Sequence, residues 1–131
     1  MYRIGVDIGG MSVKTGLVDE DGKIIKKTVT KTDRNTDVVL TNIKKDIDKL
    51  LEETGIKLSE IKGIGVGCPG SIDTEKGEVI YSNNLDWEHF GIVKGLNALT
   101  GLNVRISNDA NVAALAETVR LGAGARTRGA M

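Results

Sequence analysis

One segment restricts the possible fold more than any other. Residues 61–68 read Ile-Lys-Gly-Ile-Gly-Val-Gly-Cys, a short stretch with one charge, three glycines and several β-branched residues. Such a stretch is typical of a strand that is buried on both faces of a parallel sheet. We therefore expect an α/β domain with this strand near the centre of its sheet.

The segment before this strand predicts a meander and a helix. Loosely alternating apolar residues predict strands over 2–8, 12–18 and 23–30, with turns at residues 9–10 and 19–22. Apolar residues then recur at helical spacing over 36–54, after Asn35 or Thr36 as the cap and before a stop at Gly55.

The segment after it predicts one hairpin, two helices and one strand. The hairpin is expected over 71–82, the first helix over 91–99 and the strand over 104–107. An alanine-rich helix follows to about Leu121, with Asn108 or Asp109 as its N-cap. The predicted order is βββαβαβα.

Composition excludes several classes of function. A chain of 131 residues has the size of one domain. Its 18 basic and 18 acidic residues cancel, so no overall field favours nucleic acid or an anionic membrane. The lone Cys68 cannot form an internal disulfide, and no apolar stretch reaches the roughly 20 residues of a membrane span. We expect a cytoplasmic protein with neither a nucleic-acid nor a membrane partner.

The first candidate site is the turn after the first strand. Glycine makes up 17 of the 131 residues, about twice its usual share of roughly 7 %, and Gly9 and Gly10 follow Asp7 directly. Glycines let backbone N–H groups approach phosphate oxygens, and a nearby carboxylate can hold Mg²⁺ directly or through water. The alternative is an ordinary hairpin turn, in which Asp7 only satisfies backbone groups.

The second candidate site is the strand-to-helix junction at residues 107–111. Its sequence, Ser-Asn-Asp-Ala-Asn, places Asp109 at the carboxyl end of a parallel strand, where open α/β sheets bind ligands. An aspartate there can accept a proton from an attacking hydroxyl, and the asparagines can bind sugar hydroxyls. The alternative is that Asp109 only caps the helix.

Two loops supply further polar groups. A Pro-Gly turn at residues 69–70 follows the buried strand, and Asn83 and Asn84 lie further along the chain. Exposed backbone amides and paired asparagines can bind a polyol, but both loops also have ordinary turn explanations. Cys68 fits a small packing residue better than a nucleophile.

The order of these motifs resembles that of the ROK family of sugar kinases and sugar-responsive regulators. The motifs are DxGG at 7–10, GxPGxxD at 67–73, NNLDW at 83–87 and NDAN at 108–111, and the likeness runs to about residue 124. The resemblance implies a ribonuclease-H-like lobe of the actin and hexokinase type over 1–124, with a mixed five-stranded sheet. Residues 125–131 would lead into a second lobe that is not in this chain.

The resemblance also implies roles for individual residues. Asp109 would be the catalytic base, and Gly70, Asn84, Asn108 and Asp109 would contact the sugar. The nucleotide phosphates and Mg²⁺ would contact Asp7, Gly9, Gly10, Ser12 and Lys14. Asp7 would bind the magnesium ion directly or through a water molecule.

One residue departs from the family pattern. The family usually has threonine where this chain has Met11, and a thioether cannot donate a hydrogen bond to phosphate. Ser12 takes over this contact, or backbone amides suffice, or nucleotide affinity is reduced.

The expected function is that of an ATP-dependent hexose kinase, with glucose as the first candidate substrate, ATP and Mg²⁺ as cofactors, and a homodimer as the assembly. The resemblance implies that the chain alone is inactive, because the family's second lobe carries the second phosphate turn and further sugar contacts. The family's structural zinc site is expected only in that second lobe. The alternatives are a sugar-sensing ROK regulator and a non-catalytic actin-like scaffold. The first strand begins at Tyr2, which leaves no room for a DNA-reading helix and favours the kinase.

Overall fold

The computed structural model describes residues 1–68, 71–73, 78–81, 90–107 and 111–117. The strands are β1 (Tyr2–Ile8), β2 (Ser12–Val18), β3 (Ile24–Lys31), β4 (Ile61–Gly67), β5 (Ser71–Asp73), β6 (Glu78–Tyr81) and β7 (Asn103–Ser107). The helices are α1 (Thr36–Thr54), the short 3₁₀ helix η1 (Leu58–Glu60) and α2 (Ile92–Thr100), and residues 112–117 are also helical.

Five strands form one mixed sheet in the order β3-β2-β1-β4-β7. The first three are the antiparallel meander that the sequence predicts, and β4 and β7 extend it in parallel with β1. The middle strand is β1, so β4 is an inner strand beside it rather than the central one. The hairpin β5–β6 forms a separate two-stranded sheet.

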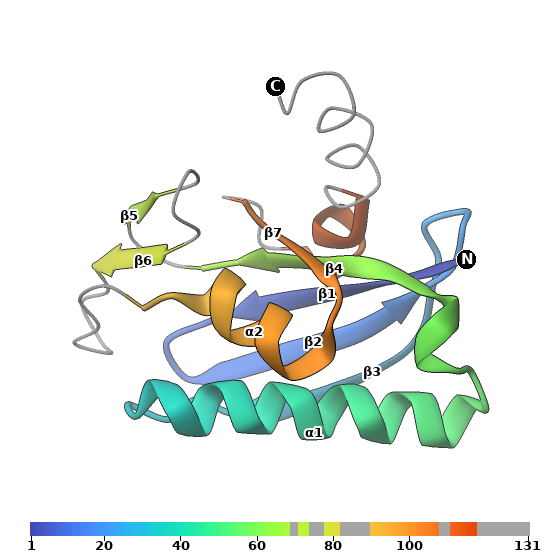
Figure 1. The fold of residues 1–131 in the computed structure, drawn as a ribbon, viewed down its shortest axis with the longest axis horizontal. Coiled ribbons are helices and arrows are strands. Elements are labelled where there is room, and N and C mark those ends of the chain that lie inside the picture. The colour runs from blue at the N-terminus through green and yellow to red at the C-terminus, as the bar shows by residue number, and fades with distance from the viewer. Residues whose placement is uncertain (69–70, 74–77, 82–89, 108–110, 118–131) are drawn as a thin grey trace.

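The helices α1 and α2 cover one face of this sheet (Figure 1). The Asn35 side chain caps α1 by accepting from the N–H groups of Asp37 and Val38, and Gly55 ends the helix with a φ of 74°. Both bounds agree with the sequence prediction. The main core lies between these helices and the inward side chains of the sheet, which include Ile4, Val6, Ile64 and Val66.

The helical residues 112–117 lie on the opposite face (Figure 1). Val112 and Ala116 pack there with Val18 in a second, smaller cluster. The approach is close because the paired positions Gly5 and Gly16 carry no side chains. A Cβ at Gly5 would lie 2.1 Å from the Val112 carbonyl oxygen, and one at Gly16 would lie 2.5 Å from Val112 Cγ1.

The cap of this last helix differs from the sequence prediction. Asn111 Oδ1 accepts from the N–H groups of Ala113 at 2.9 Å and Ala114 at 3.2 Å, so Asn111 is the N-cap. The prediction that Asn108 or Asp109 caps the helix is therefore wrong. Asn108, Asp109 and Asn111 are all residue types that can cap a helix, and the residue that follows the observed cap, Val112, packs on the sheet.

In the part of the chain that the structure describes, no helix is both long enough and apolar enough to cross a membrane.

Candidate functional site

The candidate site lies at the carboxyl edge of the parallel strands. Strand pairing places Lys14, Asp7, Gly67 and Ser107 in one row across β2, β1, β4 and β7. Because side chains alternate along a strand, Asp7 shares the face of Gly5, which is the face that residues 112–117 cover. Open α/β sheets bind ligands at this edge. The ends of β1 and β7 are two strand spacings apart, about 10 Å.

Asp7 is a half-buried carboxyl group near the end of β1. Removal from water raises its pKa, and the charge of Lys14 on the neighbouring strand opposes part of this rise. Lys14 is exposed and stands directly opposite Asp7. The pair gives the edge one carboxylate and one ammonium group, which can hold a metal-bound phosphate between them.

The turn from β1 to β2 has a defined pattern of hydrogen bonds. The Gly9 N–H donates to the Ser12 carbonyl oxygen at 2.8 Å, so this N–H is already used within the turn. Among the described residues, no acceptor takes the N–H of Gly10 or Met11. These two N–H groups are therefore the donors that the turn can offer to an anion. Gly9 offers no free donor, but it has no side chain that could block the anion.

Two side chains of the turn bear on the question of phosphate contacts. The Met11 side chain is 87 % exposed, so it neither fills the turn nor blocks its backbone. The Ser12 side chain is half-buried and forms no hydrogen bond to any residue within the described ranges. Backbone amides and the Ser12 hydroxyl are both present to replace the hydroxyl that Met11 lacks.

Sequence reasoning did not find Thr32, which follows β3 directly. Its Oγ1 donates to the Gly9 carbonyl oxygen at 2.8 Å, and its N–H donates to the Met11 carbonyl oxygen at 3.0 Å. Thr32 therefore contacts both sides of the turn from 23 residues away. No local pattern signals such a contact, because it depends on the register of β2 with β3.

Cys68 behaves as a packing residue, as expected. Its side chain is partly buried against the main core. Burial, and secondly the negative charge of Asp7, raise the pKa of the thiol to about 12. The thiol is thus protonated at neutral pH and is a poor nucleophile.

The other predicted site residues lie outside the described residues. These are Gly70, Asn84, Asn108 and Asp109. The structure brings together Asp7, Gly9, Gly10, Ser12 and Lys14 at the carboxyl edge, and it fixes the two ends, Ser107 and Asn111, between which Asp109 stands in the chain.

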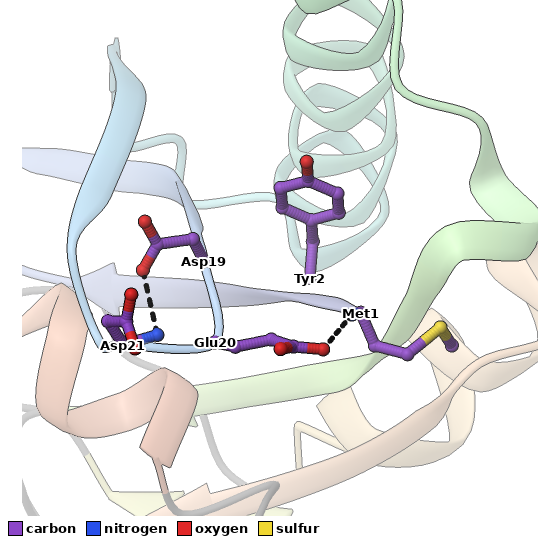
Figure 2. A pocket seen from close by; sticks show the side chains of 5 residues that line it. All are labelled: Met1, Tyr2, Asp19, Glu20 and Asp21. Carbon is purple, nitrogen blue, oxygen red and sulfur yellow. Dashed lines mark hydrogen bonds and ion pairs between the residues drawn. The ribbon is translucent and has the colours of Figure 1, made fainter.

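A pocket at the opposite end of β1 does not belong to this site. Met1, Tyr2, Asp19, Glu20 and Asp21 line it, as Figure 2 shows. Two of its acidic groups have local partners: Asp19 Oδ1 accepts from the N–H of Asp21 at 2.9 Å, and Glu20 pairs with the terminal amine of Met1. These contacts stabilise the turn between β2 and β3.

Asp7 offers one carboxylate at this edge, which is compatible with the way Mg²⁺ usually binds to proteins. The described residues contain no group of three or more histidine, cysteine or acidic side chains that could hold a metal. Mg²⁺ usually keeps several waters and binds through one or two carboxylates together with substrate phosphates. A cation beside Asp7 would also favour the charged form that burial disfavours.

Comparison with known proteins gives consistent similarities. The model of the ROK family matches residues 3–128. A glucokinase of Thermotoga maritima is 42 % identical over 87 % of this chain and 35 % of its own length, and one of Halalkalibacterium halodurans is 35 % identical over 88 % and 36 %. The chain thus spans about a third of the length of these curated relatives.

One solved structure and one putative repressor are also similar to this chain. A ROK family glucokinase from Streptomyces griseus, solved with glucose and AMPPNP, has a TM-score of 0.74 and 30 % identity over 85 % of this chain and 34 % of its own. A putative xylose repressor of a Caldicellulosiruptor species is 28 % identical over 87 % of this chain and 29 % of its own length.

Proposed function

Because this chain belongs to the ROK family, as the match over residues 3–128 shows, we propose that it forms the N-terminal lobe of an ATP-dependent hexose kinase and that glucose is its sugar. The names of the glucokinase relatives support this, as does the structural neighbour that binds glucose and an ATP analogue. The reaction transfers the γ-phosphoryl group of ATP to the primary hydroxyl of the sugar.

In this proposal the residues divide into a sugar side and a nucleotide side. Asp109 accepts the proton of the attacking hydroxyl, and Gly70, Asn84 and Asn108 bind the other hydroxyls. Lys14, Ser12 and the turn at Gly9 and Gly10 face the phosphates. Mg²⁺ near Asp7, bound directly or through water, would supply charge neutralisation on the β- and γ-phosphates.

The observation that carries this proposal is the row from Asp7 to Ser107 at the carboxyl edge of the sheet. Asp109 is two residues from Ser107 and two from Asn111, and two residues span at most about 7 Å. A base on that segment is therefore within reach of the edge that carries Asp7. Since Asn111 caps the following helix, capping does not account for Asp109.

A sugar-sensing regulator is the alternative function, and the similarity to a putative repressor supports it. Regulators and kinases of this family share the lobe, so the two are distinguished by turnover. We therefore test the full-length protein in a coupled kinase assay with glucose, N-acetylglucosamine, N-acetylmannosamine, fructose and allose. Binding of a sugar without phosphorylation of any of them would favour the regulator.

The exchange Asp109→Asn tests the mechanism. We expect the full-length variant to keep its sugar affinity and to lose about 10²- to 10⁴-fold in kcat, because the amide can form hydrogen bonds but cannot accept the proton. Its melting temperature should equal that of the parent, because Asn111 supplies the cap.

Asn111→Ala is the stability control for this exchange. It should cost about 1 kcal/mol of unfolding free energy, because it removes the cap. A kcat of Asp109→Asn near the parental value would show that Asp109 is not the base.

A further inference from the structure

We propose that Thr32 is a positioning residue for the phosphate-binding turn, an inference that rests on the proposed function. Thr32 is half-buried at the end of β3 and belongs to none of the motifs that identify the family. It donates from its side chain to the Gly9 carbonyl oxygen and from its backbone to the Met11 carbonyl oxygen.

The first step concerns the orientation of the Gly10 N–H. In a trans peptide the carbonyl and the N–H of one peptide unit point in opposite directions, and the described chain has no cis peptide. The Gly9 carbonyl and the Gly10 N–H share such a unit. When Thr32 Oγ1 holds the carbonyl, at 2.8 Å, it turns the Gly10 N–H away from β3.

The second step concerns which donors remain. The Gly9 N–H is bonded to the Ser12 carbonyl oxygen, and the Gly10 and Met11 N–H groups have no acceptor among the described residues. Without the Thr32 hydroxyl, the peptide unit between Gly9 and Gly10 loses its side-chain restraint. Its carbonyl dipole could then rotate toward a bound phosphate and repel it.

The third step concerns Met11. A threonine at that position could donate a side-chain hydrogen bond to phosphate, but the Met11 side chain is almost fully exposed and has no donor. The turn therefore depends on its backbone amides and on the Ser12 hydroxyl. Nucleotide affinity then depends more strongly on a residue that fixes the orientation of the peptide unit between Gly9 and Gly10.

The exchange Thr32→Val in the full-length protein tests this role. Valine keeps the shape and the backbone N–H but removes the hydroxyl. We expect the Kd for magnesium AMPPNP and the KM for MgATP to rise about 5- to 10-fold, in the upper part of the range for one lost hydrogen bond. The KM for glucose should change less than twofold, because the proposed function assigns this turn to the phosphates and not to the sugar.

Two control variants complete the experiment. Thr32→Ser keeps the hydroxyl and should stay within about twofold of the parent for MgATP. Thr28→Val makes the same exchange on β3, at a half-buried residue whose side chain bonds to no residue within the described ranges, and should also match the parent.

The outcomes separate this inference from the proposed function. A parental nucleotide affinity in Thr32→Val, or equal rises in the KM for glucose and for MgATP, would overturn the role of Thr32 and leave the kinase assignment intact. A parent protein that binds no nucleotide would instead overturn the kinase assignment, and the role of Thr32 with it.

Discussion

The folded chain partly removes water from the Asp7 carboxyl group, which raises its pKa above the ordinary value of 3.8. The nearby Lys14 ammonium opposes this effect without cancelling it. A raised carboxyl pKa means that the folded state binds the proton more tightly than the unfolded state does. Stability is therefore lost as the pH rises from 3.8 through the folded pKa, and the loss is complete above that pKa.

We expect Asp7→Asn to stabilise this chain at neutral pH, because the amide carries no charge to desolvate. The gain in the urea midpoint over the parent should be largest near pH 7 and should shrink as the pH falls toward 3.8. Urea unfolding at several pH values between about 4 and 7 measures it. A difference that is independent of pH, or that favours the parent at pH 7, would contradict the assigned cause.

A stabilising exchange at Asp7 fits a group that is retained for function. Residues at functional sites often cost stability that the rest of the fold supplies. Asp46 provides a contrast in the same chain: it is buried, but it accepts from Thr30 Oγ1 at 2.7 Å and so joins β3 to α1. Asp7 has no comparable protein donor among the described residues, which leaves its oxygens available for a cation.

At the scale of elements, Val112 couples the last helix to the meander. Gly5 faces the Val112 backbone, whereas Gly16 faces its side chain. The helix begins one residue after its cap, Asn111, and the proposed base stands two residues before that cap. The fit of Val112 over the two glycines therefore sets how closely the helix after Asn111 approaches the meander.

The two glycines should respond differently to a second mutation. Gly5→Ala and Gly16→Ala should each cost about 1–3 kcal/mol or more of unfolding free energy by overpacking. Val112→Ala should recover at least about 1 kcal/mol of the cost of Gly16→Ala, since it removes the contacting Cγ1. It should relieve Gly5→Ala much less, because the nearest atoms there belong to the Val112 main chain and Cγ1 lies farther away, at 3.0 Å.

Denaturant unfolding of the four single and double variants, beside Val112→Ala alone, measures both couplings. Equal rescue of the two glycine variants would mean that the helix moves as a unit. In that case the Val112 side chain would not be what fixes its distance from the sheet.

Local sequence signals predicted where the helices and strands begin and end better than they predicted the contacts between distant elements. The bounds of α1 follow from Asn35 and Gly55, which act on their own neighbours in the chain. The cap of the last helix could not be predicted in the same way, because Asn108, Asp109 and Asn111 have similar capping ability. The observed cap stands next to Val112, which packs over the glycines of two distant strands, and no local signal reveals that contact.

The candidate site shows the same division between local and non-local information. The placement of Asp7, Gly9 and Gly10 at a strand end was predictable, because a carboxylate and two glycines stand at the end of an apolar run. Thr32 was not, because its contact with Gly9 requires β3 to pair with β2 in one register, with Lys31 opposite Ser12. A shift of that register by one residue would direct the Thr32 side chain to the other face.

At the scale of the whole molecule, this chain supplies one wall of the proposed site. It spans about a third of the length of the glucokinase relatives, and its described residues carry the carboxyl edge with Asp7 and Lys14. Phosphoryl transfer also requires groups that surround the γ-phosphate and exclude water from it. We propose that these groups come from the rest of the full-length protein.

The isolated chain of 131 residues should therefore fold but should not turn over. Its own core and its five-stranded sheet support folding, so we expect cooperative urea unfolding and slow hydrogen exchange in β1 and β4. Turnover of glucose and MgATP should stay at the background of a coupled assay in which the full-length protein is active. The Asp109→Asn form of the isolated chain is the matched control and should give the same background. Turnover by the isolated chain above that control would show that one lobe is sufficient for catalysis, and the assignment of essential groups to the rest of the protein would then be wrong.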